Sequence, residues 1–68
     1  MEIFSKRLRE LREQRRLSRK VASELCGFYE HAFRRYERGE AIPSAEALSI
    51  MADEFGVSMD YLWKKKKK

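Results

Sequence analysis

Residues Arg19 to Arg38 read RKVASELCGFYEHAFRRYER, and this stretch decides the fold. It is typical of two short helices around a tight turn at Gly27, because glycine adopts a positive φ without steric cost. Ala22 and Ser23 are small, so the two helices can cross closely there. We therefore predict a helix-turn-helix over about residues 19–38.

The residues around this stretch predict further helices. Phe4, Leu8 and Leu11 are spaced i, i+4, i+7, and Leu48, Met51, Ala52 and Phe55 are spaced i, i+3, i+4, i+7, so each set forms one apolar stripe. Three serines are placed to cap helix N-termini, and two glycines are placed to end helices: Ser18, Ser44 and Ser58, and Gly39 and Gly56. The predicted helices cover about residues 2–15, 18–26, 30–38, 44–55 and 58–63.

The apolar stripes predict one core, with either Leu25 or Cys26 facing inward. Its other expected members are Phe4, Leu8, Leu11, Leu17, Ala22, Phe28, Phe33, Tyr36, Leu48, Met51, Ala52, Phe55, Val57 and Leu62. The pattern predicts an all-α domain over residues 1–63 and contains no strand signal.

Length and cysteine content predict a soluble cytoplasmic protein. A chain of 68 residues forms one domain, and its single cysteine cannot form an internal disulfide, which favours a reducing compartment. The N-terminus lacks the apolar region of a signal peptide, and no apolar run approaches the roughly 18 residues of a membrane span.

The net charge of +5 is unevenly distributed along the chain. Residues 1–38 contain eleven Lys/Arg and six Asp/Glu, a net +5, and residues 39–63 contain five Asp/Glu and no Lys/Arg, a net −5. This asymmetry predicts an anionic partner for the half that contains the helix-turn-helix. Lys64 to Lys68 add +5 and should be disordered, either as an added solubility tail or as a natural basic arm.

Catalysis has no support in the sequence, and we expect a protein that is not an enzyme. One His and one Cys cannot supply the usual ligands of a metal site. Cys26 falls on an apolar face and is interpreted as a small core residue. No cofactor or small-molecule ligand is expected.

With these residues placed, the chain resembles the Cro/C1-type helix-turn-helix family, which includes lambdoid phage repressors and many bacterial regulators. The resemblance covers about residues 3–63. Its marks are Leu8-Arg9-Glu10-Leu11-Arg12, Leu17-Ser18, Glu24-Leu25-Cys26-Gly27, Arg35-Tyr36-Glu37-Arg38-Gly39, Ile42-Pro43-Ser44 and Gly56-Val57-Ser58-Met59-Asp60-Tyr61-Leu62. It implies a compact five-helix, lambda repressor-like domain that binds a double-stranded DNA operator, often as a dimer, with its third helix in the major groove.

The resemblance also implies roles for individual residues. Base-reading positions correspond to Tyr29, Glu30, His31 and Arg35. Arg34 corresponds to a position nearer the DNA backbone. From the residues themselves, Arg19 and Lys20 are expected to bind phosphate, because they lie at the N-terminus of the second predicted helix, where backbone N–H groups attract anions. Arg38 and Ser44 could hold the DNA backbone on the other side. Arg12 and Glu37 correspond to a structural ion pair between the first and third helices. The chain departs from the family at Arg19, where Gln is usual, and at Tyr29-Glu30, where Ser or Thr often begins the third helix.

Of the base-reading candidates, Arg35 has the clearest chemistry, because a guanidinium can bridge guanine O6 and N7. His31 could donate to guanine or to a phosphate. Glu30 could accept from cytosine N4 or interact with the helix dipole, and Tyr29 could contact a thymine methyl or cover Phe28.

The expected function is sequence-specific DNA binding by a bacterial or phage-encoded transcriptional regulator, most simply a repressor that occludes polymerase. Two alternatives stay open: a protein-interaction module such as an antitoxin or accessory subunit, and a scaffold that no longer binds DNA. A homodimer is a further expectation, since Tyr61, Leu62 and Trp63 could either pair two copies or close the core.

Overall fold

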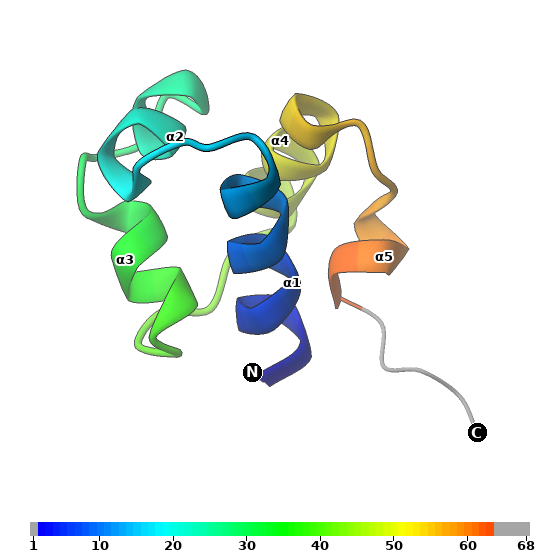
Figure 1. Ribbon diagram of the computed structural model, residues 1–68. Coiled ribbons are helices and arrows are strands. Elements are labelled where there is room, and N and C mark those ends of the chain that lie inside the picture. Colours follow the sequence, from blue (N-terminus) through cyan, green and yellow to red (C-terminus); the bar gives the residue numbers. More distant parts are fainter. Residues whose placement is uncertain (1, 64–68) are drawn as a thin grey trace.

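The computed structural model describes residues 2–63, which form five helices and, within that range, no strand (Figure 1). These are α1 (Glu2–Gln14), α2 (Arg19–Leu25), α3 (Ala32–Glu37), α4 (Ala45–Phe55) and α5 (Met59–Trp63). The predicted all-α class is confirmed. The prediction for Lys64 to Lys68 lies outside the described residues. No helix within residues 2–63 has the length and apolar character needed to cross a membrane.

The helices divide into two groups on either side of α1. In Figure 1, α2 and α3 lie on one side of α1, and α4 and α5 lie on the other. α3 packs against both α1 and α2, while α5 packs against α1 and α4. The basic half of the sequence therefore builds α1, α2 and α3, and the acidic half builds α4 and α5.

The helix ends follow the predicted capping residues. The side-chain oxygens of Ser18, Ser44 and Ser58 each accept a hydrogen bond from the backbone N–H three residues later, at 3.1, 3.1 and 3.0 Å. Gly56 ends α4 with a left-handed φ of 68°. These contacts satisfy backbone groups that a helix end leaves without intrahelical partners.

The start of α3 was predicted wrongly, because the helix begins at Ala32 and not at Glu30. Gly27 reverses the chain with φ 76°, and the connection between α2 and α3 extends through His31. His31 is the N-cap but makes no side-chain capping bond. Instead, the fully buried Ser23 hydroxyl on α2 accepts from the N–H of Phe33 at 3.0 Å. The first turn of α3 is thus capped by the preceding helix.

The core resembles the predicted one, with one choice resolved. Cys26 is buried and Leu25 is 51% exposed, so Cys26 is the residue that faces inward. Ala47 is also buried and was not predicted. The buried apolar residues are Phe4, Leu8, Leu11, Ala22, Cys26, Phe33, Ala47, Leu48, Met51, Ala52, Phe55 and Leu62, and Leu17, Phe28, Tyr36 and Val57 are partly buried against them.

Arg16 adopts a left-handed conformation with φ 58°, which is unusual for a residue with a side chain. The backbone N–H of Arg16 donates to the carbonyl of Glu13 at 3.0 Å, and that of Leu17 donates to Arg12 at 3.2 Å. These bonds end α1 and turn the chain toward α2. A non-glycine residue in this conformation costs on the order of 1 kcal/mol or more.

Candidate nucleic-acid interface

An ion pair between Arg12 and Glu37 fixes α3 against α1. Arg12 Nε donates to Glu37 Oε2 at 2.6 Å and its NH2 group donates to Oε1 at 3.0 Å, which is a bidentate contact. Arg12 also donates to the carbonyl of Leu17 at 2.8 Å. The two side chains are only 12% and 3% exposed. The pair therefore lies largely inside the domain, where its role is to position α3.

The charge of Arg12 is favoured by these partners. Its hydrogen bond with Glu37 raises the pKa of Arg12. Burial acts in the opposite direction, and the carboxylates of Glu37 and Glu13 add further raising contributions. A second hydrogen bond also joins α1 to α3: Ser5 Oγ on α1 donates to the carbonyl of Tyr36 on α3 at 2.7 Å.

Phe33 and Tyr36 anchor α3 to the core. Phe33 is fully buried and Tyr36 is partly buried. The Phe33 ring lies 6.1 Å from that of Phe55, and the Tyr36 ring lies 5.8 Å from that of Phe4. These contacts fix which side of α3 faces the core.

The four predicted base-reading residues are all exposed. Tyr29 is 91% exposed, and Glu30 and His31 lie beside it in the connection that leads into α3. Arg35 lies one helical turn further on. The structure also brings two of these residues into contact, which the sequence did not predict: His31 Nε2 lies 3.3 Å from Glu30 Oε2.

The predicted phosphate-binding residues fall into two groups. Arg19, Lys20 and Arg34 are exposed and form no ion pair within residues 3–63. Arg38 already has a partner, since its Nε lies 3.0 Å from Glu40 Oε2, although both side chains are about half exposed. The hydroxyl of Ser44 is used to cap α4.

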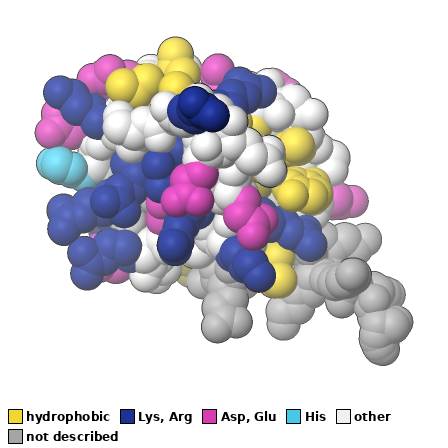
Figure 2. Space-filling view, viewed as in Figure 1, with side chains coloured by type: hydrophobic (Ala, Val, Ile, Leu, Met, Phe, Trp, Pro, Cys, Tyr) yellow, Lys and Arg dark blue, Asp and Glu magenta, His cyan; other side chains and the backbone are white. Residues whose placement is uncertain are grey.

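Figure 2 shows how the charged side chains are distributed on one face of the domain. Lys and Arg side chains gather on the side occupied by α2 and α3 in Figure 1, and the histidine lies at the edge of this region. We call Arg19, Lys20, Arg34 and Arg35 the helix-turn-helix cations. All four are exposed, and none forms an ion pair in the part of the chain that the structure describes.

Two further arginines in the α1–α2 connection were not predicted as candidates. Arg15 and Arg16 are exposed and lie two residues or more before Ser18, the N-cap of α2. The Arg15 guanidinium lies 5.0 Å from the centre of the Phe55 ring, a cation–π contact that holds it against the domain. Four basic residues lie close together in the sequence here: Arg15, Arg16, Arg19 and Lys20. This clustering is the signal by which Arg15 and Arg16 could have been predicted.

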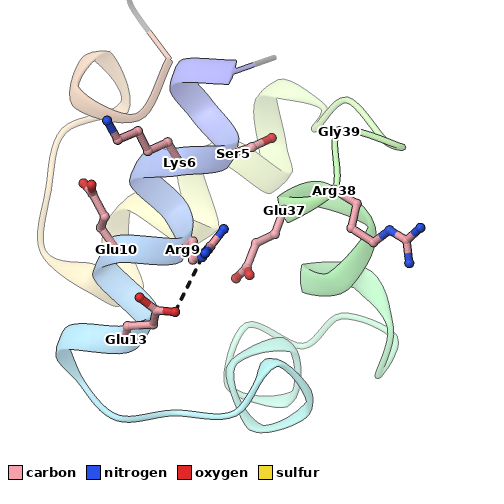
Figure 3. Close-up of a pocket in the computed structure, with 8 residues that line it drawn as sticks. All are labelled: Ser5, Lys6, Arg9, Glu10, Glu13, Glu37, Arg38 and Gly39. Carbon is pink, nitrogen blue, oxygen red and sulfur yellow. Dashed lines mark ion pairs between the residues drawn. The ribbon is translucent and has the colours of Figure 1, made fainter.

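A groove of about 650 Å³ lies between α1 and the end of α3 (Figure 3). Its walls carry both charge signs, and Arg9 and Glu13 pair across one turn of α1 at 3.5 Å. The lining residues are Ser5, Lys6, Arg9, Glu10, Glu13, Glu37, Arg38 and Gly39. Acids and bases balance in this groove, so it shows no preference for an anionic or a cationic ligand.

Cys26 lacks the environment of a nucleophile. Burial raises the pKa of the Cys26 thiol to about 11, and the Glu54 carboxylate adds to the shift. A thiol with this pKa stays protonated at neutral pH, and the thiolate is the reactive form. No group of three or more His, Cys, Asp or Glu side chains among the described residues is arranged to hold a metal ion.

The fold and this exposed basic surface define a class: a compact five-helix domain in which α2 and α3 form a helix-turn-helix. The model of the helix-turn-helix domain family matches residues 3–62. The chain therefore belongs to the helix-turn-helix domain family.

Comparison with known proteins confirms the predicted resemblance to the Cro/C1-type helix-turn-helix family. The HTH-type transcriptional regulator AnsR of Bacillus subtilis (strain 168) is 38% identical over 56 residues, which are 82% of this chain and 48% of AnsR. The chain thus spans about half the length of that relative.

Two solved structures have the same fold. The P22 c2 repressor protein, in complex with synthetic operator 9T, superposes with a TM-score of 0.86 and 25% identity over 94% of this chain and 97% of that one. The restriction-modification controller protein C.AhdI from Aeromonas hydrophila has a TM-score of 0.82 and 27% identity over 91% and 94% of the two chains.

Proposed function

We propose that this chain is the DNA-binding domain of a cytoplasmic transcriptional regulator that acts as a repressor by occupying its operator. The observation that carries the proposal is the set of helix-turn-helix cations. They are exposed and lack ion-pair partners among the described residues, as do Lys6, Arg15 and Arg16, whereas Arg9, Arg12 and Arg38 each contact a carboxylate. The four share the side of the domain formed by α2 and α3. A polyanion supplies the missing counter-charges.

The geometry of α3 supports docking in a DNA groove. An α-helix fits the major groove of B-DNA, and the N-terminal residues of a recognition helix contact base edges. The core contacts of Phe33 and Tyr36 leave Tyr29 and Arg35 exposed. In this pose Arg35 bridges guanine O6 and N7, and Tyr29 packs against a sugar or a thymine methyl.

The remaining cations orient the domain on the duplex. Arg19, Lys20 and Arg34 contact phosphates, which fixes the register of the domain without specifying sequence. Arg38 also contacts a phosphate if its guanidinium leaves Glu40. The N-terminus of α4, capped by Ser44, follows the connection from α3 to α4 and is a further phosphate contact. The P22 c2 repressor, which has the same fold, was solved with an operator.

We also propose that two copies bind together through α5. Leu62 is fully buried and belongs to the core, whereas Met59 and Tyr61 are 38% and 41% exposed. The Arg7 guanidinium lies 4.8 Å from the centre of the Tyr61 ring and donates to the Tyr61 carbonyl. These contacts hold Tyr61 to α1, so a fixed surface is available for pairing.

Binding of random-sequence duplex DNA as a function of salt tests the proposal. A chain that ends at Trp63 should lose affinity linearly in a plot of log K against log salt, with a slope of about −3 for three or four phosphate contacts. The full chain is the control for the contribution of Lys64 to Lys68, and its slope should be steeper. If the chain that ends at Trp63 binds no duplex at any salt concentration, an interaction module or an inactive scaffold is the better account.

A further inference from the structure

We infer that Arg16, in the connection between α1 and α2, contacts the DNA backbone and adds a phosphate-binding residue outside the helix-turn-helix. The inference rests on the proposed DNA-binding function. The connection runs from the end of α1 to α2 across one end of the domain (Figure 1). Two observations on Arg16 carry the inference: its left-handed backbone, with φ 58°, and an exposed side chain that has no partner within residues 3–63.

The turn after α1 explains the backbone conformation of Arg16 but not its side chain. The N–H of Arg16 donates to the carbonyl of Glu13 at 3.0 Å, and the chain then changes direction toward α2. Glycine adopts a left-handed conformation without steric cost, whereas a residue with a Cβ atom is disfavoured there. An arginine at this position therefore lowers the stability of the turn, unless its side chain makes contacts that offset the cost.

The folded domain supplies no such contacts. In the described part of the chain, the Arg16 side chain forms no hydrogen bond, ion pair or cation–π contact. The adjacent Arg15 differs, because its guanidinium lies 5.0 Å from the centre of the Phe55 ring on α4. An exposed cation at a strained backbone position, without a contact inside the protein, indicates a contact outside it.

Arg12 holds the connection in a fixed position relative to α3. Its carbonyl accepts from the N–H groups of Arg15 and Leu17 at 3.1 and 3.2 Å, and its guanidinium donates to the Leu17 carbonyl at 2.8 Å. The same guanidinium binds Glu37 on α3. Because one side chain joins the connection to the recognition helix, the backbone of Arg16 is already ordered before DNA binds, which lowers the entropic cost of the contact.

The position of Arg16 in the chain brings it close to the phosphate-binding candidates at the start of α2. Its Cα atom is at most about 11 Å from that of Arg19, which is three steps along the chain. Phosphates follow one another at about 3.4 Å of helix axis along a DNA strand, so both cations can contact the same strand. Residues 15–20 contain four basic residues and no acid, and the nearest preceding acid, Glu13, is paired with Arg9 at 3.5 Å.

The salt dependence of duplex binding by Arg16→Gly, made in the full chain, tests the inference. The variant should reduce the slope of log K against log salt by about 1 for a random-sequence duplex pool. The ratio of wild-type to variant affinity should then shrink about three- to fourfold between about 50 and about 200 mM salt. The melting temperature of Arg16→Gly should be no lower than that of the wild-type chain, because glycine relieves the left-handed conformation.

Two further variants are the controls for Arg16→Gly. Arg15→Ala removes the same charge from the adjacent position, where the guanidinium is held against Phe55. Its melting temperature should fall slightly, and its salt slope should equal that of the wild-type chain. Arg16→Lys keeps a cation that can bind a phosphate, so it should retain most of the slope that Arg16→Gly loses.

The outcomes separate this inference from the proposed function. An unchanged slope in Arg16→Gly would overturn the inference, and so would a lower melting temperature, because the side chain would then stabilise the fold. Equal slope losses in Arg15→Ala and Arg16→Gly would also overturn it, since they would report net charge and not a contact at Arg16. So would an Arg16→Lys slope no steeper than that of Arg16→Gly. If the wild-type chain binds no duplex at any salt concentration, the proposed function itself fails.

Discussion

Replacing Glu37 with alanine should lower the free energy of unfolding by about 3–5 kcal/mol, which is the largest effect expected of any single substitution considered for this domain. Glu37 is 3% exposed and accepts two hydrogen bonds from Arg12, at 2.6 and 3.0 Å. Its removal leaves a guanidinium largely buried with the Leu17 carbonyl as its remaining hydrogen-bond acceptor. Chemical denaturation monitored by circular dichroism measures the loss.

A double variant shows whether the stranded charge is the cause. Arg12→Met combined with Glu37→Met should be more stable than Glu37→Ala, because neither charge is left buried alone. The exposed pair Arg9–Glu13, with its atoms 3.5 Å apart, supplies the matched control, and Arg9→Ala should cost only a few tenths of a kcal/mol. Arg9 is used because Glu13 also lies 3.9 Å from Arg12. Equal losses for Glu37→Ala and Arg9→Ala would contradict a structural role for the buried pair.

Replacing Arg35 with alanine should weaken binding to a selected duplex by about 1–3 kcal/mol and relax preference at one base pair. Arg35 is exposed on α3 and has no ion-pair partner in the described part of the chain, so the variant should keep the stability of the wild-type domain. Competition between duplexes that differ at single base pairs measures both effects.

Arg34→Ala is the control for Arg35→Ala, because it removes the same charge from the adjacent position. As a phosphate contact, Arg34 should contribute similarly to every duplex, and its loss should reduce the salt slope by about 1 without changing base preference. An Arg35→Ala variant that weakens all duplexes equally would reassign Arg35 to the DNA backbone.

Local signals predicted most of the fold. Ser18, Ser44 and Ser58 each cap the expected helix, because N-capping depends on one side chain and the backbone three residues later. The apolar stripe of α4 is buried as its spacing indicates. Such features need no knowledge of distant contacts.

The features that were missed depend on contacts between elements. Ser23 looked like a small residue that allows close packing, but its hydroxyl also caps α3 from α2, which is visible only once both helices are placed. For the same reason α3 starts at Ala32, two residues later than the prediction. Arg16 shows no local signal for its left-handed backbone, because glycine is the residue that normally indicates one.

The candidate site was predicted as a set of residues but not as a set of contacts. The exposure of Arg35 follows from the core positions Phe33 and Tyr36 that flank it on α3, and Tyr29 is exposed in the connection before that helix. The sequence does not show which cations form ion pairs, because this depends on where the side chains lie in the folded domain. Arg38 pairs with Glu40, whereas Arg34 and Arg35 pair with no acid in the described structure. The contact between Glu30 and His31 depends on the conformation of the α2–α3 connection.

Selection of bound duplexes from a random-sequence pool, with the chain that ends at Trp63, shows whether the face formed by α2 and α3 reads DNA sequence. We expect one enriched sequence, and two copies paired through α5 would place its half-sites one helical turn, about 10.5 base pairs, apart. Arg35→Ala should lose the preference at one position of that sequence. A pool that binds but yields no enriched sequence would contradict the claim that the face formed by α2 and α3 reads DNA sequence.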